Sequence, residues 1–269
     1  MSEELLALAR EVAREAAALV RDRRADGVSV AATKSSVVDV VTEADRASEE
    51  LIRRRIAAAR PEDAFLGEEG GSRAGSSGVR WIVDPIDGTV NFLYGIPEYA
   101  VSIAAEVEGQ VVAGVVVNAA TGVTYAAARG AGATRDGVPL RVRPVPPLPE
   151  RLVLTGFGYR GDVRAHQAAT VAALLPHVRD IRRQGSCALD LCHVAEGAAD
   201  AYVEEGPQPW DYSAGGIVVE QAGGRFGLLE GSLPPDLAEA GGRGLVVASA
   251  RDGWDSFVDA LAEHGFLRE

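Results

Sequence analysis

The chain has 269 residues, enough for one large domain or two small ones with a substantial core. Apolar residues make up 47% of it and charged residues 25%, which is ordinary for a globular protein. The formal net charge of −12 argues against non-specific binding to nucleic acid or to an anionic membrane surface. If the substrate is itself anionic, the protein must recruit a cation, and a metal ion is the obvious candidate.

The first segment predicts a helix over residues 3–23, because its apolar residues recur at helical spacing from Leu5 to Val20. The same segment has acidic residues where a secretory signal would be basic, and it contains no long apolar run. We therefore expect no signal peptide, no membrane span and a cytoplasmic location.

A second helix is predicted over residues 43–59, with Thr42 as its N-cap and Asp45 in its first turn. Residues 29–42, between the two helices, read as a loop or a hairpin, and the glycine- and serine-rich residues 70–78 as a flexible loop. Strands are expected within 98–117 and 122–127. The pair Asp136-Gly137 then predicts a hairpin within 128–142.

The segment PVPPLPE, residues 144–150, is the best candidate for a linker, because four prolines in seven residues resist both a helix and a central strand. It divides the chain into an N-terminal half, residues 1–143, and a C-terminal half, residues 150–269. Beyond it we expect strands at 152–155, 199–204 and near 244–248, and helices at about 163–176, 187–197 and 211–222. Helices mixed with strands in both halves predict packed α/β (α+β) layers.

Five acidic residues stand out along the chain. Three of them follow short apolar runs: AFLG precedes Glu68, WIV precedes Asp84, and PW precedes Asp211. The other two are Asp45, at the start of a predicted helix, and Asp87. Carboxylates at the ends of strands can converge in a cleft, and oxygen ligands of this kind suit a hard divalent cation, above all Mg²⁺. Taken singly, each acid is an ordinary turn former, cap or loop residue; only the combination indicates a site.

The segment WIVDPIDGTVNF, residues 81–92, contains two of these acids and a predicted turn between them. Pro85 fixes φ and starts a turn that can bring Asp87 back beside Asp84. Gly88 allows the backbone to come close to a ligand, and a helix that begins at about Thr89 would offer free N–H groups to an anion. Metal ions beside a phosphate-sized anion site imply transfer of a phosphoryl group to water.

Other phosphatase chemistries do not fit the chain. The DxDx[TV] pattern of aspartyl-phosphate enzymes needs acids two apart, whereas Asp84 and Asp87 are three apart. Neither Cys187 nor Cys192 is followed by the arginine of a cysteine-phosphatase loop, and no G-x-x-x-x-G-K-[ST] occurs. The four histidines are scattered and fit no phosphohistidine motif. With two cysteines and no Cys/His array, neither a disulfide framework nor a structural zinc site is expected.

With these motifs, the chain resembles the inositol monophosphatase family of Mg²⁺-dependent, lithium-sensitive sugar phosphatases. Four segments carry the resemblance in order: KSSVVDVVTEAD (34–45), FLGEEG (65–70), WIVDPIDGTVNF (81–92) and WDYSAGGIVVEQAGG (210–224). The resemblance implies the layered α-β-α-β-α sandwich of the inositol monophosphatase and fructose bisphosphatase type. It also implies a homodimer.

By position, the resemblance gives two main Mg²⁺ ions. Glu68, Asp84 and the carbonyl of Ile86 would hold the first, and Asp84, Asp87 and Asp211 the second. A third, weaker ion would use Glu68 and water.

The same resemblance assigns the remaining roles. Thr89 and Glu68 would orient and deprotonate the attacking water, and Asp45 would support Thr89 as its partner. The backbone N–H groups of Gly88 and Thr89 would bind phosphate, and Lys34 would add positive charge. The residues expected to contact the polyol are Gly185, Ser186, Cys187 and Glu204. Cys187 stands where the family typically has alanine, and the spacing to Asp211 favours Glu204 over Glu205.

The expected function is Mg²⁺-dependent hydrolysis of a small phosphate monoester, foremost inositol 1-phosphate, with a phosphorylated polyol or sugar as the partner. Histidinol phosphate, fructose 1,6-bisphosphate and 3′-phosphoadenosine 5′-phosphate are rival substrates in the same superfamily. A non-catalytic, metal-binding regulatory protein on the same scaffold is the alternative class.

Overall fold

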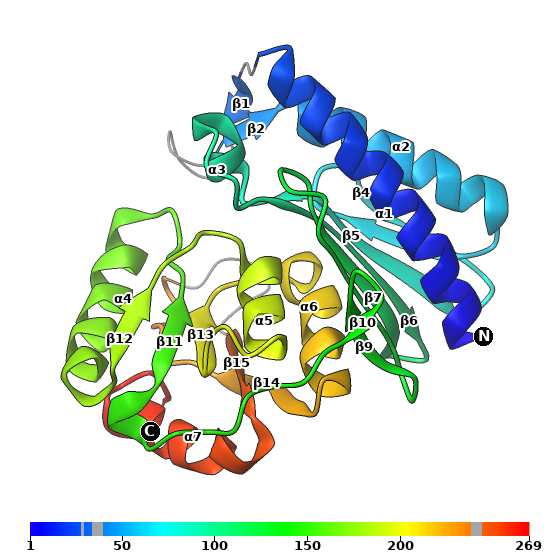
Figure 1. Ribbon diagram of the computed structural model, residues 1–269. Helices are drawn as coiled ribbons and strands as arrows, with labels where there is room; N and C mark the ends of the chain where they lie inside the picture. The colour runs from blue at the N-terminus through cyan, green and yellow to red at the C-terminus, as the bar shows by residue number, and fades with distance from the viewer. Residues whose placement is uncertain (28–29, 34–39, 238–243, 269) are drawn as a thin grey trace.

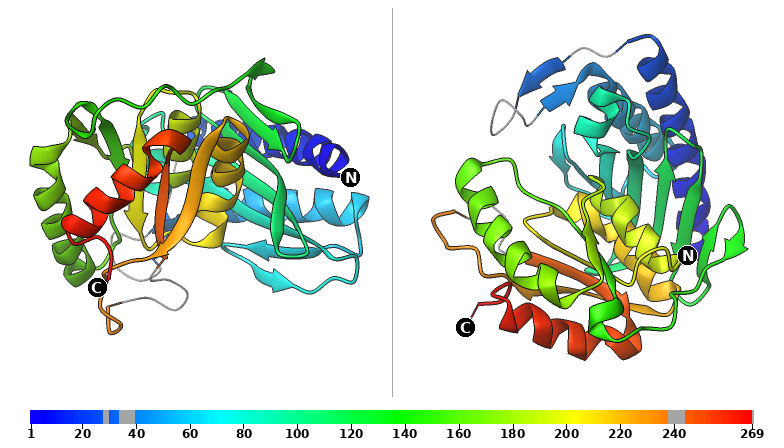
Figure 2. Two further views of the ribbon diagram at one scale, coloured as in Figure 1. Left: turned by 90° about the horizontal axis from the view of Figure 1, so that it is seen from below. Right: turned by 60° about the vertical axis from the view of Figure 1, so that its left-hand side comes forward.

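The computed structural model describes residues 1–27, 30–33, 40–237 and 244–268. Five layers stack in the order helix, sheet, helix, sheet, helix (Figure 1; further views in Figure 2). Helices α1 (Ser2–Ala25) and α2 (Glu43–Ala59) cover the outer face of a large sheet. Helices α5 (Cys187–Ala195) and α6 (Pro209–Gln221) fill the space between the two sheets, and α4 (Gly161–Leu174) and α7 (Trp254–Glu263) lie outside the small sheet. The predicted layered sandwich is confirmed.

The large sheet has eight strands in the order β10-β9-β8-β7-β6-β5-β3-β4, antiparallel except for the parallel pair β3 and β5. Its strands are β3 (Ala64–Gly67), β4 (Gly71–Arg73), β5 (Val79–Asp87), β6 (Ala100–Val107), β7 (Gln110–Asn118), β8 (Thr124–Ala128), β9 (Gly132–Arg135) and β10 (Val138–Pro139). The expected hairpin at Asp136-Gly137 joins β9 to β10. A separate two-stranded sheet pairs β1 (Val30–Thr33) with β2 (Val40–Thr42).

The small sheet has five strands in the order β12-β11-β13-β15-β14. They are β11 (Leu152–Thr155), β12 (Asp180–Arg182), β13 (Ala201–Glu205), β14 (Gly224–Glu230) and β15 (Gly244–Ala250). Short 3₁₀ turns occupy Leu148–Glu150, Leu175–His177 and Arg251–Gly253, and α3 (Thr89–Tyr94) follows β5. The large sheet is built before residue 144 and the small sheet after residue 150, yet α5 and α6 pack between both sheets. The division into two halves therefore stays a prediction.

Four elements differ from the sequence-based expectations. Residues 71–73 were expected in a flexible loop, but β4 pairs with β3 and forms the edge of the large sheet. Strands β12 and β14 and helix α7 were not predicted from the sequence. The three residues of β12 offer no apolar run, and β14 alternates irregularly because it lies at a sheet edge. Helix α7, in contrast, carries a readable signal, since Trp254, Phe257 and Leu261 are buried at helical spacing.

Helix α6 lies directly against strand β7, and a glycine permits this contact. A Cβ atom on Gly114 would come 2.5 Å from Ile217 Cγ2 and 2.9 Å from the Cα of Ala214. The backbones of helix and strand therefore touch where any larger residue would push them apart. This contact sets the height of α6 above the sheet, and with it the position of the acid in the first turn of the helix.

We expect Gly114→Ala to lower the free energy of unfolding by about 1–3 kcal/mol, because the added methyl group overpacks the interface between α6 and β7. Gly161→Ala is the matched control, since Gly161 begins α4 and has no atom within 4 Å of its Cβ position. Urea unfolding followed by circular dichroism measures both. Equal midpoints for the two variants would contradict the packing argument.

Candidate metal centre and active site

Two of the acids come from strand β5, at a break in its pairing. Asp84 pairs with Ser102 of β6 and Asp87 with Ala100, so three steps on β5 match two on β6. In a regular strand, residues three apart point to opposite faces, and this bulge allows Asp84 and Asp87 to face the same side. Asp84 was expected at the end of a strand, but it lies inside β5, and Asp87 is the last residue of that strand.

The third acid comes from the start of helix α6. Asp211 is the third helical residue, and its Oδ2 accepts a hydrogen bond of 2.6 Å from the backbone N–H of Gln208, the N-cap. Asp211 therefore lies at a helix start, as the helix predicted over residues 211–222 implies. The Ser102 hydroxyl donates to the carbonyl of Trp210 over 3.1 Å, which fastens this turn to the strand beside Asp84.

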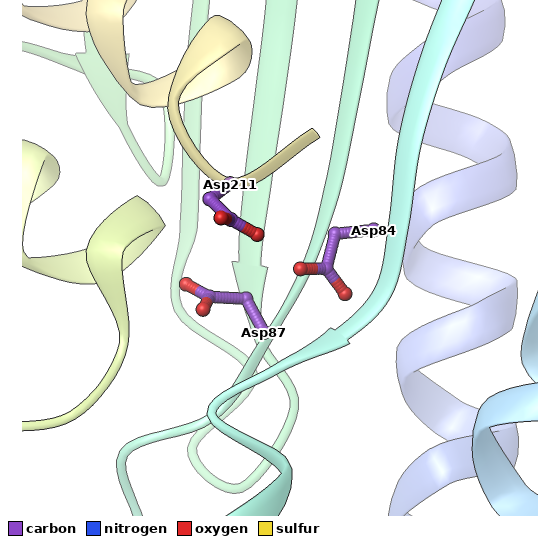
Figure 3. A group of neighbouring side chains, drawn as sticks. All are labelled: Asp84, Asp87 and Asp211. Atoms are coloured by element: carbon purple, nitrogen blue, oxygen red, sulfur yellow. The ribbon is translucent and has the colours of Figure 1, made fainter. Parts of the chain in front are cut away.

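These three acids converge on one point (Figure 3). One oxygen from each of Asp84, Asp87 and Asp211 lies within 4.8 Å of the other two. Strand β5 of the large sheet and helix α6 of the middle layer thus supply one cluster. Three carboxylate oxygens at this separation can bind the same cation.

Glu68 joins the cluster from strand β3. It follows Gly67, the last residue of β3, and its N–H donates to the carbonyl of Val83 over 3.3 Å. This bond continues the parallel pairing of Gly67 with Val83 by one step, so Glu68 lies beside Asp84. Its negative charge is one of the causes that raise the pKa of Asp84.

Thr89 and Asp45 form a pair at the edge of the cluster. Thr89 Oγ1 lies 3.1 Å from Asp45 Oδ1 and 2.9 Å from the carbonyl oxygen of Ile86, and its single proton can be donated to one of them at a time. Asp45 is buried at 1% exposure, and its Oδ2 accepts from the backbone N–H of Thr42 over 2.8 Å. Gly88, before Thr89, has φ +88°, and a Cβ there would come 2.8 Å from the carbonyl oxygen of Glu98. Only glycine fits this turn.

The cluster carries concentrated negative charge. Burial and the charge of Glu68 raise the pKa of Asp84 well above its usual value, and burial with repulsion from Asp87 does the same for Asp211. Burial raises the pKa of Asp87 to about 7, although Ser186 and Ala188 donate hydrogen bonds to it. Burial likewise raises the pKa of Asp45 to about 6.

Within the described ranges, no lysine, arginine or histidine forms an ion pair with Asp84, Asp87 or Asp211. Buried charges need a partner, and the donor set here consists of oxygen atoms alone. It therefore fits a hard divalent cation such as Mg²⁺ and does not fit zinc or another metal that prefers nitrogen and sulfur. Asp84, Asp87, Asp211 and Glu68 are the side chains that would hold it, with the carbonyl of Ile86.

The acids form one end of a cavity of about 300 Å³. Gly185, Cys187 and Glu204 line another part of its wall, and Gly88 and Thr89 also face it. The Glu204 carboxylate accepts a hydrogen bond of 2.5 Å from the Tyr202 hydroxyl and lies against Gly156, where a Cβ would come 2.0 Å from Oε2.

Burial raises the pKa of Glu204, while the Tyr202 bond and the positive charge of Arg183 oppose the shift. The neighbouring Glu205 also lines the cavity, but its Oε1 accepts from the backbone N–H of Leu233 over 2.8 Å. Glu205 therefore holds the loop around Leu233, whereas Glu204 has no such bond to that loop and faces the cavity.

Ser186 and Cys187 have different surroundings from each other. Ser186 is 1% exposed and does not line the cavity; its hydroxyl donates to Asp87 Oδ2 over 2.5 Å and caps α5. Ala188 N–H donates to the same oxygen over 2.7 Å. Ser186, expected against the polyol, thus positions a metal ligand. Cys187 faces the cavity as a neutral thiol, because burial raises its pKa. Lys34 lies outside the described residues.

Several residues of the cavity wall were not predicted as site residues, and two of them, Arg183 and Gly156, lie close to residues that were. The guanidinium of Arg183 lies over Gly185, with Nη1 2.6 Å from the position of a Cβ on that glycine, and it brings a positive charge near Glu204. Gly156 makes room for Glu204. The two glycines of GFGYR, residues 156–160, are a sequence signal for Gly156. No local pattern distinguishes Arg183 from the arginines around it.

Fold and cavity together define a layered protein with an acidic site that suits a divalent cation. The model of the inositol monophosphatase family matches residues 1–263, and the chain belongs to that family. It is 48% identical over 267 residues to the inositol-1-monophosphatase SuhB of Mycobacterium tuberculosis, covering 93% of this chain and 90% of the relative. The Nus factor SuhB of Xylella fastidiosa is 39% identical over 209 residues, covering 77% and 76%.

Two solved structures have the same fold. Mycobacterium tuberculosis SuhB superposes with a TM-score of 0.84 at 43% identity, covering 100% of this chain and 99% of that chain. The inositol monophosphatase of Anabaena superposes with a TM-score of 0.80 at 30% identity, covering 97% and 96%. Among the described helices, none is long and apolar enough to cross a membrane.

We expect Mg²⁺ to stabilise the protein more at pH 8 than at pH 5. Because the folded-state pKa values of Asp45 and Asp87 lie above the ordinary 3.8, ionisation costs stability as the pH rises from about 4 to 7 without a cation. A cation relieves this cost only when the carboxylates are ionised. At 100 times its dissociation constant Mg²⁺ adds about 2.7 kcal/mol, or roughly 5–10 °C in melting temperature.

Thermal unfolding with EDTA and with Mg²⁺, at pH 5 and pH 8, measures this difference. Asp84→Asn should lose the Mg²⁺ effect and melt at or above the wild-type temperature in EDTA, because one repelling charge is gone. Asp259→Asn, on the exposed side of α7, is the control and should keep the full effect. An equal Mg²⁺ shift at both pH values would contradict the proposed charge cluster.

Proposed function

We propose that the chain hydrolyses inositol 1-phosphate to inositol and inorganic phosphate in a Mg²⁺-dependent reaction. One observation carries the proposal: Asp84, Asp87 and Asp211, which form no ion pair with the part of the chain that the structure describes, line the same small cavity as the carboxylate of Glu204. The acids suit a cation that receives the phosphate group, and Glu204 suits the hydroxyl groups of a polyol. The cavity, at about 300 Å³, has the size of a small ligand site.

When Mg²⁺ is bound, it neutralises charge on the phosphoryl oxygens and lowers the pKa of the attacking water. The side chains then move the proton. A Thr89 hydroxyl that donates to Asp45 keeps its lone pairs free to accept from water, and Glu68 is the nearby carboxylate that can take the proton. The N–H groups of Gly88 and Thr89 would receive the phosphoryl oxygens. Water is the nucleophile, so the reaction forms no covalent bond to the protein.

The polyol would lie against Glu204, Gly185 and Cys187. Glu204 is held rigid by Tyr202 and Gly156, so its carboxylate can accept from two adjacent hydroxyl groups with little loss of side-chain entropy. Cys187 is small and neutral and leaves room for a ring. Ser186 acts indirectly, because it fixes Asp87.

A regulatory role without catalysis is the second candidate, and the name of the Xylella relative, a Nus factor, brings it into consideration. The complete set of acids with Thr89 favours catalysis, because a protein that only regulates has no need for a water-activating pair. The net charge of −12 continues to argue against nucleic acid as a direct partner. Assembly as a homodimer and a cytoplasmic location are proposals that rest on the family resemblance.

We expect inositol 1-phosphate to be the preferred substrate in a panel with histidinol phosphate, fructose 1,6-bisphosphate and 3′-phosphoadenosine 5′-phosphate. Glu204→Gln should raise the KM for inositol 1-phosphate roughly 10-fold or more, because a charged acceptor for hydroxyl groups is lost. Hydrolysis of p-nitrophenyl phosphate, which has no polyol, should change little. Phosphate release with Mg²⁺, with EDTA and with Mg²⁺ plus Li⁺ measures each reaction.

A preference for fructose 1,6-bisphosphate would keep the metal centre but transfer specificity from Glu204 to Arg183, the cation on the cavity wall. An equal effect of Glu204→Gln on both inositol 1-phosphate and p-nitrophenyl phosphate would refute the polyol role of Glu204. Absence of Mg²⁺-dependent hydrolysis from the whole panel would favour the regulatory candidate.

A further inference from the structure

We propose that Glu49 is a positioning residue for the metal centre: it anchors the turn that carries Glu68 and thereby raises the affinity of the site for Mg²⁺. The inference rests on the proposed Mg²⁺-dependent function and deepens it. Glu49 does not line the cavity, so it acts through the backbone and not as a ligand.

Glu49 belongs to a buried row on helix α2. Asp45, Ser48 and Glu49 stand at spacings of three and four, which place them on one face of the helix. Each is at most 3% exposed, and each reaches a different segment of the site. Asp45 contacts Thr89 at the start of α3, and the Ser48 hydroxyl donates to the carbonyl of Pro85 over 3.1 Å. Glu49 reaches the third segment, the turn after β3.

The Glu49 carboxylate is fully engaged. Its Oε2 accepts from the backbone N–H of Glu69 over 2.7 Å, and its Oε1 accepts from Arg53 Nη2, also over 2.7 Å. Arg53 is itself held over the ring of Phe65, at 4.8 Å from the centroid. A buried carboxylate with both oxygens satisfied is a rigid anchor, because losing the Arg53 bond leaves a buried charge unpaired and losing the Glu69 bond leaves a buried oxygen unsatisfied.

Two glycines allow the turn to close around this carboxylate. A Cβ on Gly67 would come 2.5 Å from Glu49 Oε2, and a Cβ on Gly70 would come 2.4 Å from Oε1 and 2.0 Å from Arg53 Nη2. Both ends of the GEEG segment therefore need glycine because the backbone lies against Glu49 and Arg53. The two glycines and the glutamate form one packing unit from distant parts of the sequence.

The anchor fixes the direction of the Glu68 side chain. The N–H of Glu68 donates to Val83, and the N–H of the next residue donates to Glu49. Because the peptide planes on both sides of the Glu68 Cα are held, its Cα–Cβ bond has a fixed direction beside Asp84. When the bond from the Glu69 N–H to Glu49 is weakened, the Glu68 side chain samples more orientations. Ordering it around a cation then costs more conformational entropy.

Glu49→Gln tests this role with Glu50→Gln as the matched control. Glu50 is the next residue of the same helix, is exposed, and loses the same charge on substitution. We expect Glu49→Gln to raise the dissociation constant for Mg²⁺ roughly 10-fold, as outer partners of metal ligands do, and Glu50→Gln to leave it unchanged. Isothermal titration calorimetry with MgCl₂ on the substrate-free protein measures both. At saturating Mg²⁺, the KM for substrate should stay at the wild-type value.

Gly70→Ala provides a second variant if Glu49→Gln does not fold. Its methyl group would collide with Glu49 and Arg53 and push the turn away from them, and the same loss of Mg²⁺ affinity is expected. Equal affinities for wild type, Glu49→Gln and Gly70→Ala would overturn the inference while leaving the proposed function intact. A wild-type protein that binds Mg²⁺ with the expected difference between variants, yet hydrolyses no member of the panel, would support the inference and refute the proposed function. A wild-type protein that binds no Mg²⁺ would overturn both.

Discussion

The repulsion among buried carboxylates is the constraint on which the rest of the structure depends. Asp84, Asp87 and Asp211 lie with oxygens within 4.8 Å of one another, in surroundings that raise the pKa of each. Left to themselves, three such groups would move apart or take up protons. The protein holds them in place with neutral donors, which satisfy the carboxylates but do not cancel their charge.

These donors use one side of each carboxylate. The N–H of Ile86 binds Asp84 Oδ1, Ser186 and Ala188 bind Asp87 Oδ2, and the N–H of Gln208 binds Asp211 Oδ2. In each case a neutral donor of the protein fixes one oxygen. A positively charged side chain in place of these donors would have filled the site permanently. The cluster therefore suits a mobile cation as its counter-charge.

The layered fold serves this arrangement, because no single element could supply the ligands. Strand β5 brings Asp84 and Asp87, strand β3 brings Glu68, and the middle layer brings Asp211. Gly114 sets the distance between α6 and the sheet, and Ser102 joins the first turn of α6 to strand β6. On the outer face, side chains of α2 bind the turns that carry Thr89 and Glu68. Helices on both faces of the large sheet thus position one site.

Much of the site could be predicted from the sequence, because its ligands lie in short segments with strong local patterns. The acids of DPIDGT and the helix start at Thr42 are examples, and the resemblance to the family connected them. What could not be predicted depends on contacts between distant residues. The bulge in β5 exists only in its pairing with β6, and the role of Ser186 is visible only from its bond to Asp87. Glu49 looks like one of many helix-surface acids until the turn around Gly67 and Gly70 is packed against it.

The measurement that tests this account most directly is the location of bound ions by anomalous scattering from crystals grown with Mn²⁺ as a substitute for Mg²⁺. The account predicts one anomalous peak coordinated by Asp84, Asp87 and Asp211 and a second coordinated by Glu68, Asp84 and the carbonyl of Ile86. Peaks that avoid these residues, or a cluster that stays free of Mn²⁺ at saturating concentration, would contradict it.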